Sequence, residues 1–133
     1  SATIKATHNY DEKTLKSAWS HRSAAVIANM GKFGLNRMVI TSEGCAGRFG
    51  TVIISEEVPI NNEEAMEYCI YNKNEGCLKC IKSCPQNALN INGFDRFKCN
   101  EQLLKNAEEL SDIGLCDVCG KCVVSCPFAI MQK

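Results

Sequence analysis

The sequence has no excess of charge of either sign and no long apolar run. Its 133 residues contain 15 Lys and Arg against 15 Asp and Glu, so the charges balance. A chain with balanced charge lacks the excess of basic residues that binds nucleic acid or an anionic membrane surface. No run approaches the roughly 20 apolar residues that cross a bilayer, and the first residues lack the pattern of a secretion signal. We therefore expect a soluble, cytoplasmic protein with no membrane partner.

Histidine and tryptophan are also scarce. The two histidines, His8 and His21, have no neighbours that complete a ligand set, and we interpret both as surface or packing residues. The one tryptophan, Trp19, is expected in the core rather than against a cofactor. The cysteines are therefore the main candidates for functional residues in this chain.

Cysteine is abundant, and nine of the ten cysteines lie between Cys69 and Cys126. Two runs, at residues 77–84 and 116–126, share the spacing Cys-x2-Cys-x3-Cys-Pro. This is the ligand spacing of a bacterial ferredoxin, in which three cysteines of a run hold one iron–sulfur cluster and the cysteine before proline holds the other. Pro85 and Pro127, with fixed φ and no N–H, redirect the chain after each run.

The spacing predicts two interleaved ligand sets. The first run lacks its initial cysteine because Asn74 stands three residues before Cys77, and Cys69 is the nearest replacement. The first predicted set is Cys69, Cys77, Cys80 and Cys126. The second is Cys84, Cys119 and Cys122 with either Cys116 or Cys99, and spacing alone favours Cys116.

Two other interpretations of the cysteines compete with iron–sulfur clusters. A disulfide framework is typical of secreted chains. Paired Cys-x2-Cys motifs also bind zinc, and eight thiolates could hold two zinc ions tetrahedrally. Zinc, however, does not require a repeated fourth cysteine followed by proline. We therefore favour two [4Fe-4S] clusters over zinc, and zinc over disulfides.

Residues 1–60 read as one helix and two strands. Apolar residues at spacings of three and four predict a helix over residues 12–30, capped by Gly31. Two apolar runs, at residues 37–41 and 51–55, predict strands that pair with each other or lie as neighbours. The stretch between them is rich in glycine, and its glycines could let the backbone approach a large flat ligand. Cys45 within this stretch is interpreted as a free thiol.

Residues 61–133 carry the cysteine runs together with three local signals. A short helix is expected over residues 63–68, just before Cys69. A strand at residues 88–91 followed by Asn92-Gly93 predicts a hairpin. An amphipathic pattern predicts a helix over residues 95–110 between the two runs, with Cys99 near its start. The expected fold class is α+β.

These residues resemble a known family. The stretch at 23–36 (SAAVIANMGKFGLN), Met-Val-Ile-Thr at 38–41 and the glycine-rich stretch that ends in Arg-Phe-Gly at 48–50 resemble the carboxyl-terminal part of the corrinoid-binding domain of epoxyqueuosine reductases and reductive dehalogenases. In that superfamily this segment precedes a two-cluster ferredoxin module, and the resemblance covers roughly residues 19–126. It implies a partial α/β, nitroreductase-like corrinoid-domain segment at 1–60 and a bacterial two-[4Fe-4S] ferredoxin-like domain with an inserted helix at 61–133.

The resemblance also bears on individual residues. The family places a cysteine shortly after an aspartate on the intervening helix, which Asp95 and Cys99 match, so it implies Cys99 rather than Cys116 as the eighth ligand. A Tyr-Cys pair before the first run is matched by Tyr68-Cys69. The corrinoid region would include Gly44, Gly47 and Arg48.

The resulting hypothesis is an iron–sulfur electron-transfer protein, the redox portion of an oxidoreductase similar to epoxyqueuosine reductase. The implied cofactors are two [4Fe-4S] clusters and, in the full-length protein, cobalamin. The implied partners are an electron donor such as ferredoxin or flavodoxin, the amino-terminal portion of the corrinoid domain and, for a true epoxyqueuosine reductase, tRNA. The family's catalytic acid has no counterpart in these residues. The alternatives are a stand-alone two-cluster ferredoxin and a zinc-stabilised interaction module.

Overall fold

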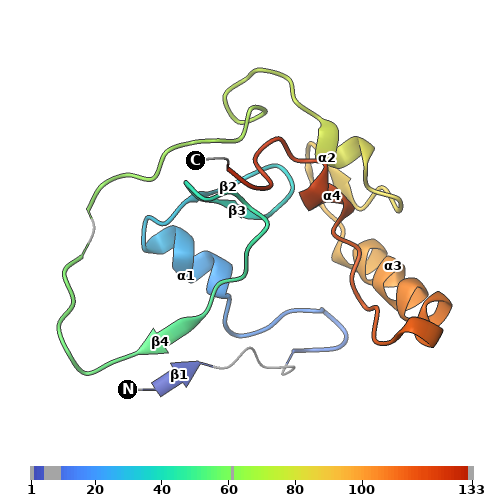
Figure 1. Cartoon of the computed structure of the whole chain (residues 1–133), viewed down its shortest axis with the longest axis horizontal. Coiled ribbons are helices and arrows are strands. Elements are labelled where there is room, and N and C mark those ends of the chain that lie inside the picture. Colours follow the sequence, from blue (N-terminus) through green and yellow to red (C-terminus); the bar gives the residue numbers. More distant parts are fainter. Residues whose placement is uncertain (1, 5–9, 61, 132–133) are drawn as a thin grey trace.

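Short helices and short antiparallel strands make up the fold (Figure 1). The computed structural model describes residues 2–4, 10–60 and 62–131. His8 and residue 61, at the expected domain boundary, lie outside the described residues. The elements in chain order are β1 (Ala2–Ile4), α1 (His21–Ile27), β2 (Lys32–Phe33), β3 (Val39–Ile40), β4 (Thr51–Ile53), α2 (Lys79–Lys82), β5 (Leu89–Asn90), β6 (Gly93–Phe94), α3 (Arg96–Glu109), the 3-10 turn η1 (Ser111–Ile113) and α4 (Lys121–Val124). This mixture is α+β in the broad sense.

The strands form three separate two-stranded antiparallel sheets, β1–β4, β2–β3 and β5–β6. The expected pairing of residues 37–41 with 51–55 is therefore wrong, and both strands are shorter than expected. The chain reverses directly before β3, where Gly34 N–H donates to Met38 O at 2.9 Å and Arg37 takes a positive φ of 62°. This tight turn places β2 beside β3 as its antiparallel partner, with Lys32 opposite Ile40. The strand β4 pairs with β1 instead.

The expected helix over residues 12–30 is also wrong at both ends, because α1 begins only at His21 and ends at Ile27, with Ala28 rather than Gly31 as its C-cap. Asp11 Oδ1 accepts the backbone N–H of Thr14 at 2.8 Å, and Leu15 has a positive φ of 50°. A side chain that bonds its own backbone in this way competes with helix formation. The helix starts where Ser20 provides its N-cap by accepting the N–H of Ser23.

No helix forms over residues 63–68, in contrast to the expectation. The carboxylate of Glu67 accepts the N–H of Cys69 at 2.8 Å and the side-chain amide of Asn72 at 3.1 Å. These bonds hold the segment in a non-helical form before Cys69. The stretch from β4 to α2 runs along the outer edge of the molecule in Figure 1.

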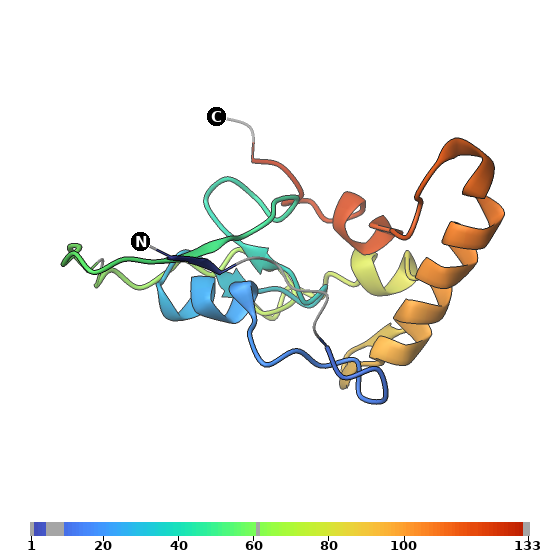
Figure 2. The same cartoon turned by 90° about the horizontal axis from the view of Figure 1, so that it is seen from below.

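The local signals after the first cysteine run are confirmed. The predicted hairpin is present as β5 and β6, and its turn is Ile91-Asn92, one residue earlier than expected. The predicted helix is α3, whose N-cap Asp95 accepts the N–H groups of Phe97 and Lys98. Figure 2 shows α3 at the opposite end of the molecule from the β1–β4 pair. No helix in the described part of the chain is long and apolar enough to span a membrane.

A small core joins the amino-terminal part to the cysteine runs. Its buried residues are Leu35, Ile40, Cys45, Cys69, Cys80 and Leu89. The glycine-rich stretch pairs with the end of the chain, where Gly44 forms a β-bridge with Ile130. Residues 35–45 therefore pack against the cysteine-bearing part of the chain.

Candidate metal centres

The two cysteine runs fold in the same way. Each contains a one-turn helix, α2 or α4, and these helices pack against each other. The N–H of Cys84 donates to Ile81 O at 3.1 Å, and the N–H of Cys126 donates to Val123 O at 3.0 Å. The sequence repeat is thus also a structural repeat, and the last cysteine of each run leaves its helix in the same turn.

One cavity, of about 230 Å³, is bordered by four cysteines drawn from both runs and from α3. They are Cys84, Cys99, Cys119 and Cys122. Burial, followed by the neighbouring Cys84 and Cys119 thiols, raises the pKa of Cys99. Burial and the same group of thiols also raise the pKa of Cys122. We call this the Cys84 cavity.

The Cys84 cavity separates the two candidates for the eighth ligand. Cys99 lines it from the first turn of α3, where its N–H donates to the O of the N-cap Asp95 at 3.2 Å. Cys116 is half-buried and is not among the lining residues. The geometry is therefore that of the set containing Cys99, although the ligand role itself stays a prediction.

A second, much smaller cavity is bordered by the other four predicted cysteines, Cys69, Cys77, Cys80 and Cys126. We call it the Cys69 cavity. Cys69 and Cys80 are 9% and 8% exposed. Burial raises the pKa of Cys80 to about 11, with Cys69 and Cys126 as further causes. The Cys69 cavity thus combines cysteines of the first run with the last cysteine of the second.

Backbone donors point at sulfur in both cavities. The N–H of Ala88 donates to Cys84 Sγ at 3.2 Å, and the N–H of Leu35 donates to Cys69 Sγ at 3.4 Å. Hydrogen bonds of this kind orient thiolate ligands and tune the metal group that they hold. Both bonds come from outside the cysteine motifs, Leu35 from the amino-terminal part.

The donor set fits iron–sulfur clusters in its chemistry. All ten cysteines are free thiols, so the disulfide framework does not occur in this structure. Among the described residues no three His, Cys, Asp or Glu side chains are grouped to hold a single metal ion. A four-iron cluster asks for a wider arrangement, because each thiolate binds a different iron.

The two cavities differ in the space that they offer. The Cys84 cavity has about 230 Å³, whereas the Cys69 cavity has about 20 Å³. The latter is enough for little more than a water molecule. A cluster of four irons would therefore require this cavity to widen.

The three residues expected to contact a corrinoid, all in the glycine-rich stretch, differ in their surroundings. Gly44 has a φ of 107°, and a Cβ there would lie 2.5 Å from Ala129 O, so its packing against the end of the chain requires glycine. Gly47 and Arg48 border a cavity of about 860 Å³, which we call the large cavity. All three also line a cavity of about 620 Å³. The structure thus brings Gly47 and Arg48 to the large cavity and gives Gly44 a packing role.

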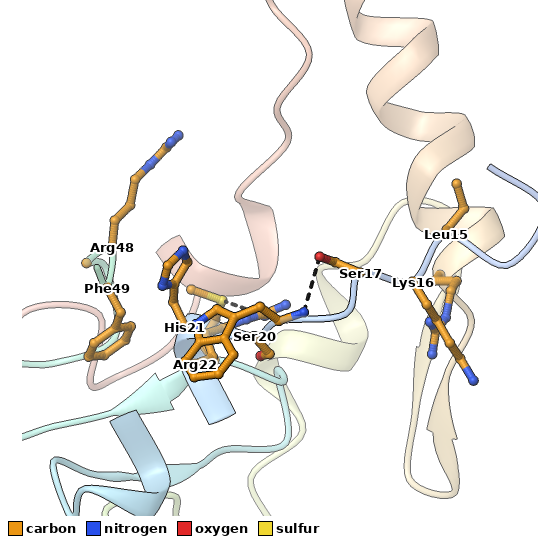
Figure 3. A pocket seen from close by; sticks show the side chains of 12 residues that line it. Leu15, Lys16, Ser17, Ser20, His21, Arg22, Arg48 and Phe49 are labelled. Atoms are coloured by element: carbon orange, nitrogen blue, oxygen red, sulfur yellow. Dashed lines mark hydrogen bonds between the residues drawn. The ribbon is translucent and has the colours of Figure 1, made fainter. Parts of the chain in front are cut away.

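The large cavity is cationic (Figure 3). Arg48 lies on one side of it, Lys16 on the other and His21 between them. Besides Arg48 and Lys16, the charged side chains at its wall are Arg22 and Arg96, and no carboxylate is among the described residues that line it. An anionic ligand would therefore meet favourable charge on several sides.

Sequence reasoning missed the aromatic part of this wall. Trp19 is 48% exposed, so its expected place in the core is wrong. Its Nε1–H donates to Thr51 Oγ1 at 3.3 Å, and His21 Nδ1 lies 2.7 Å from the same hydroxyl. Phe49 also lines the cavity. The sequence signal for this wall was the segment Trp-Ser-His-Arg at residues 19–22, in which the helix N-cap Ser20 stands between the rings of Trp19 and His21.

Comparisons with known proteins add no family to this description: no family model, no curated protein and no solved structure matches the chain.

Proposed function

We propose that this chain is an electron-transfer protein that binds two [4Fe-4S] clusters and forms the redox portion of a corrinoid-dependent reductase similar to epoxyqueuosine reductase. One observation carries the proposal: two neighbouring cavities are each bordered by four cysteines, and the last cysteine of each run lines the cavity of the other run. Neither a disulfide framework nor a site for a single metal ion requires the last cysteine of each run to line the cavity of the other run.

The proposed ligand sets are Cys69, Cys77, Cys80 and Cys126 for one cluster and Cys84, Cys99, Cys119 and Cys122 for the other. When bound, the clusters would supply one-electron redox chemistry over a wide range of potentials. The protein contributes the burial of the cysteines and the N–H donors of Leu35 and Ala88. These features adjust the affinity for the clusters and their potentials.

The corrinoid part of the proposal is supported by the large cavity. Its arginines can bind the phosphate of a nucleotide-bearing corrinoid, and Trp19 and Phe49 offer flat apolar faces. Arg22 and Met38 line both this cavity and the Cys84 cavity. A ligand in the large cavity would therefore share a wall with the second cysteine set, which is the arrangement that electron exchange between them needs.

A stand-alone two-cluster carrier is the rival function. It is favoured by the way in which the amino-terminal part covers the cysteines, since Leu35 and Ile40 belong to the same buried core as Cys69 and Cys80. An electron carrier would need its cysteines buried in this way, but it would need no ligand in the large cavity. Corrinoid binding therefore discriminates between the two.

Metal analysis after anaerobic reconstitution tests the cluster proposal. We expect eight irons and eight sulfides per chain, because a four-iron cluster contains four of each. Cys99→Ser should lose the electron paramagnetic resonance signal of one reduced cluster, whereas Cys116→Ser should keep both. A colourless chain with two zinc ions after strictly anaerobic preparation would refute the proposal, and the opposite result from the two variants would reassign the eighth ligand to Cys116.

Titration with cobalamin tests the corrinoid proposal. Reduction of cobalt by the dithionite-reduced chain, followed by absorbance, is expected once the large cavity is occupied. Arg48→Gln should weaken binding because it removes a cation from the cavity wall. A chain that carries both clusters and neither binds nor reduces cobalamin would be a plain electron carrier.

A further inference from the structure

The segment that follows β4, residues 54–60, is exposed along its whole length. Its sequence is Ile-Ser-Glu-Glu-Val-Pro-Ile, and Val58 and Ile60 are 64% and 82% exposed. No backbone hydrogen bond joins this segment to another described residue. Figure 1 shows it running along the outer edge of the molecule. We call this segment the strap.

The strap combines apolar and acidic side chains and contains no basic residue. Ile54, Val58 and Ile60 are its large apolar residues, and all three are exposed. Its two acids, Glu56 and Glu57, form no ion pair with a described residue. Apolar residues that gather on the surface of a soluble protein mark a site of interaction. The strap therefore calls for a binding surface that is apolar in part and positively charged.

The large cavity is a surface of that kind. Lys16 and Arg48 are exposed on opposite sides of it (Figure 3), and no carboxylate is among its described lining residues. Trp19 and Phe49 supply flat apolar faces. Its volume of about 860 Å³ lies within the range of about 300–1,000 Å³ that is usual for ligand sites. The charge and the apolar faces of the cavity thus complement those of the strap.

The strap is held away from the cavity of its own chain. At one end the hydroxyl of Thr51 accepts the Nε1–H of Trp19 at 3.3 Å, and beyond the other end Glu64 pairs with Lys32 at 2.6 Å. None of residues 54–60 lines the large cavity. A single chain with balanced charge therefore carries two complementary surfaces in different places. A second copy of the chain offers each surface its match.

We propose that two copies of this chain form a closed dimer in which the strap of each copy lies in the large cavity of the other. The strap carboxylates face the cations of the cavity wall, and its apolar side chains cover Trp19 and Phe49. Because both straps are exchanged, the pair has no open surface at which a third copy could add. The docking requires neither clusters nor a corrinoid. Since the proposed function places a corrinoid in the same cavity, strap and corrinoid compete for it.

Sedimentation velocity over a series of concentrations, without oxygen and without cobalamin, measures the dimer. Glu56→Lys/Glu57→Lys should raise its dissociation constant about tenfold or more, because one exposed ion pair contributes up to about fivefold and each pair occurs twice. Glu108→Lys/Glu109→Lys makes the same change of charge at the exposed end of α3 and should leave the constant unchanged. In the wild type, emission from Trp19 should shift to the blue as the dimer forms, because its exposed ring becomes covered.

Mixing two variants shows whether the strap docks in the other copy. Lys16→Glu/Arg48→Glu reverses the charge of the cavity and should weaken the dimer as the strap variant does. When the two variants are mixed, each strap meets a cavity of opposite charge in the partner, so a heterodimer should form. Docking of a strap in its own chain gives no such restoration, because neither variant has a matching strap and cavity.

Three results would overturn the proposal. These are a wild-type chain that stays monomeric over the whole concentration series, a dimer that is unchanged by Glu56→Lys/Glu57→Lys, and a mixture of the two variants that stays monomeric. Iron analysis of the same samples tests the proposed function separately. A chain that binds no iron and still forms the strap-dependent dimer supports this inference and refutes the cluster proposal, whereas an iron-loaded monomer does the reverse.

Discussion

Gly44→Ala is the substitution whose cost follows most directly from the structure. Gly44 has a φ of 107°, which side-chain-bearing residues rarely adopt, and strain of this kind costs about 1–3 kcal/mol. The added Cβ would lie 2.5 Å from Ala129 O and 2.9 Å from the carbonyl carbon, and overpacking of backbone adds about 1–3 kcal/mol. The sum is about 2–6 kcal/mol, a large part of the roughly 5–15 kcal/mol by which a domain is stable.

Urea unfolding of the full chain, followed by circular dichroism under anaerobic conditions, measures this cost. Gly50→Ala is the matched control, because a Cβ at Gly50 has no atom within 4 Å. We expect Gly44→Ala to lower the midpoint strongly and Gly50→Ala to leave it nearly unchanged. Equal midpoints for the two variants would refute the reasoning, since the close approach of the glycine-rich stretch to the end of the chain would then not exist.

Three further predictions concern other parts of the molecule. Asp95→Ala should lower the free energy of unfolding by about 1 kcal/mol through loss of the α3 N-cap, while Asp112→Ala should not, and equal losses would contradict the capping role. In the metal-free chain burial raises the pKa of Cys45 and Cys80 from 9.0 to about 11, so the native state holds these protons more tightly than the unfolded state does. The free energy of unfolding should therefore be level below pH 9.0 and fall toward pH 11, and a rise over that range in a pH series of urea unfolding would contradict it. Trp19, the one tryptophan, borders the large cavity, so cobalamin should quench its fluorescence in a saturable way, and a purely linear decrease would show that no complex forms.

Signals that depend on close sequence neighbours predicted the structure well. The capping aspartate and apolar pattern of α3 and the hairpin at residues 89–94 needed no distant partner. The grouping of the cysteines around two cavities follows the repeated spacing, while their role as ligands stays a prediction. Spacing alone favoured Cys116, whereas Cys99 is the residue that lines the Cys84 cavity, because the position of Cys99 depends on how α3 packs against the second run.

The failures occurred where distant or competing contacts decide. β4 pairs with β1 rather than with β3, because the turn before β3 supplies a nearer partner. The apolar pattern of residues 12–30 did not reveal that Asp11 would bond its own backbone and delay the helix to His21. The large cavity combines residues from four separate stretches, so no single sequence motif could predict it.

The exchange of cysteines between the two runs constrains how the protein is made. The wall of the Cys69 cavity includes residues as early as Leu35, yet it is incomplete until Cys126 has been added. A ribosome-bound chain that has exposed only the first run therefore holds an open thiol group with no finished pocket. Under the proposed function, insertion of the clusters would have to wait until synthesis has passed the second run, because both cavities include cysteines of that run.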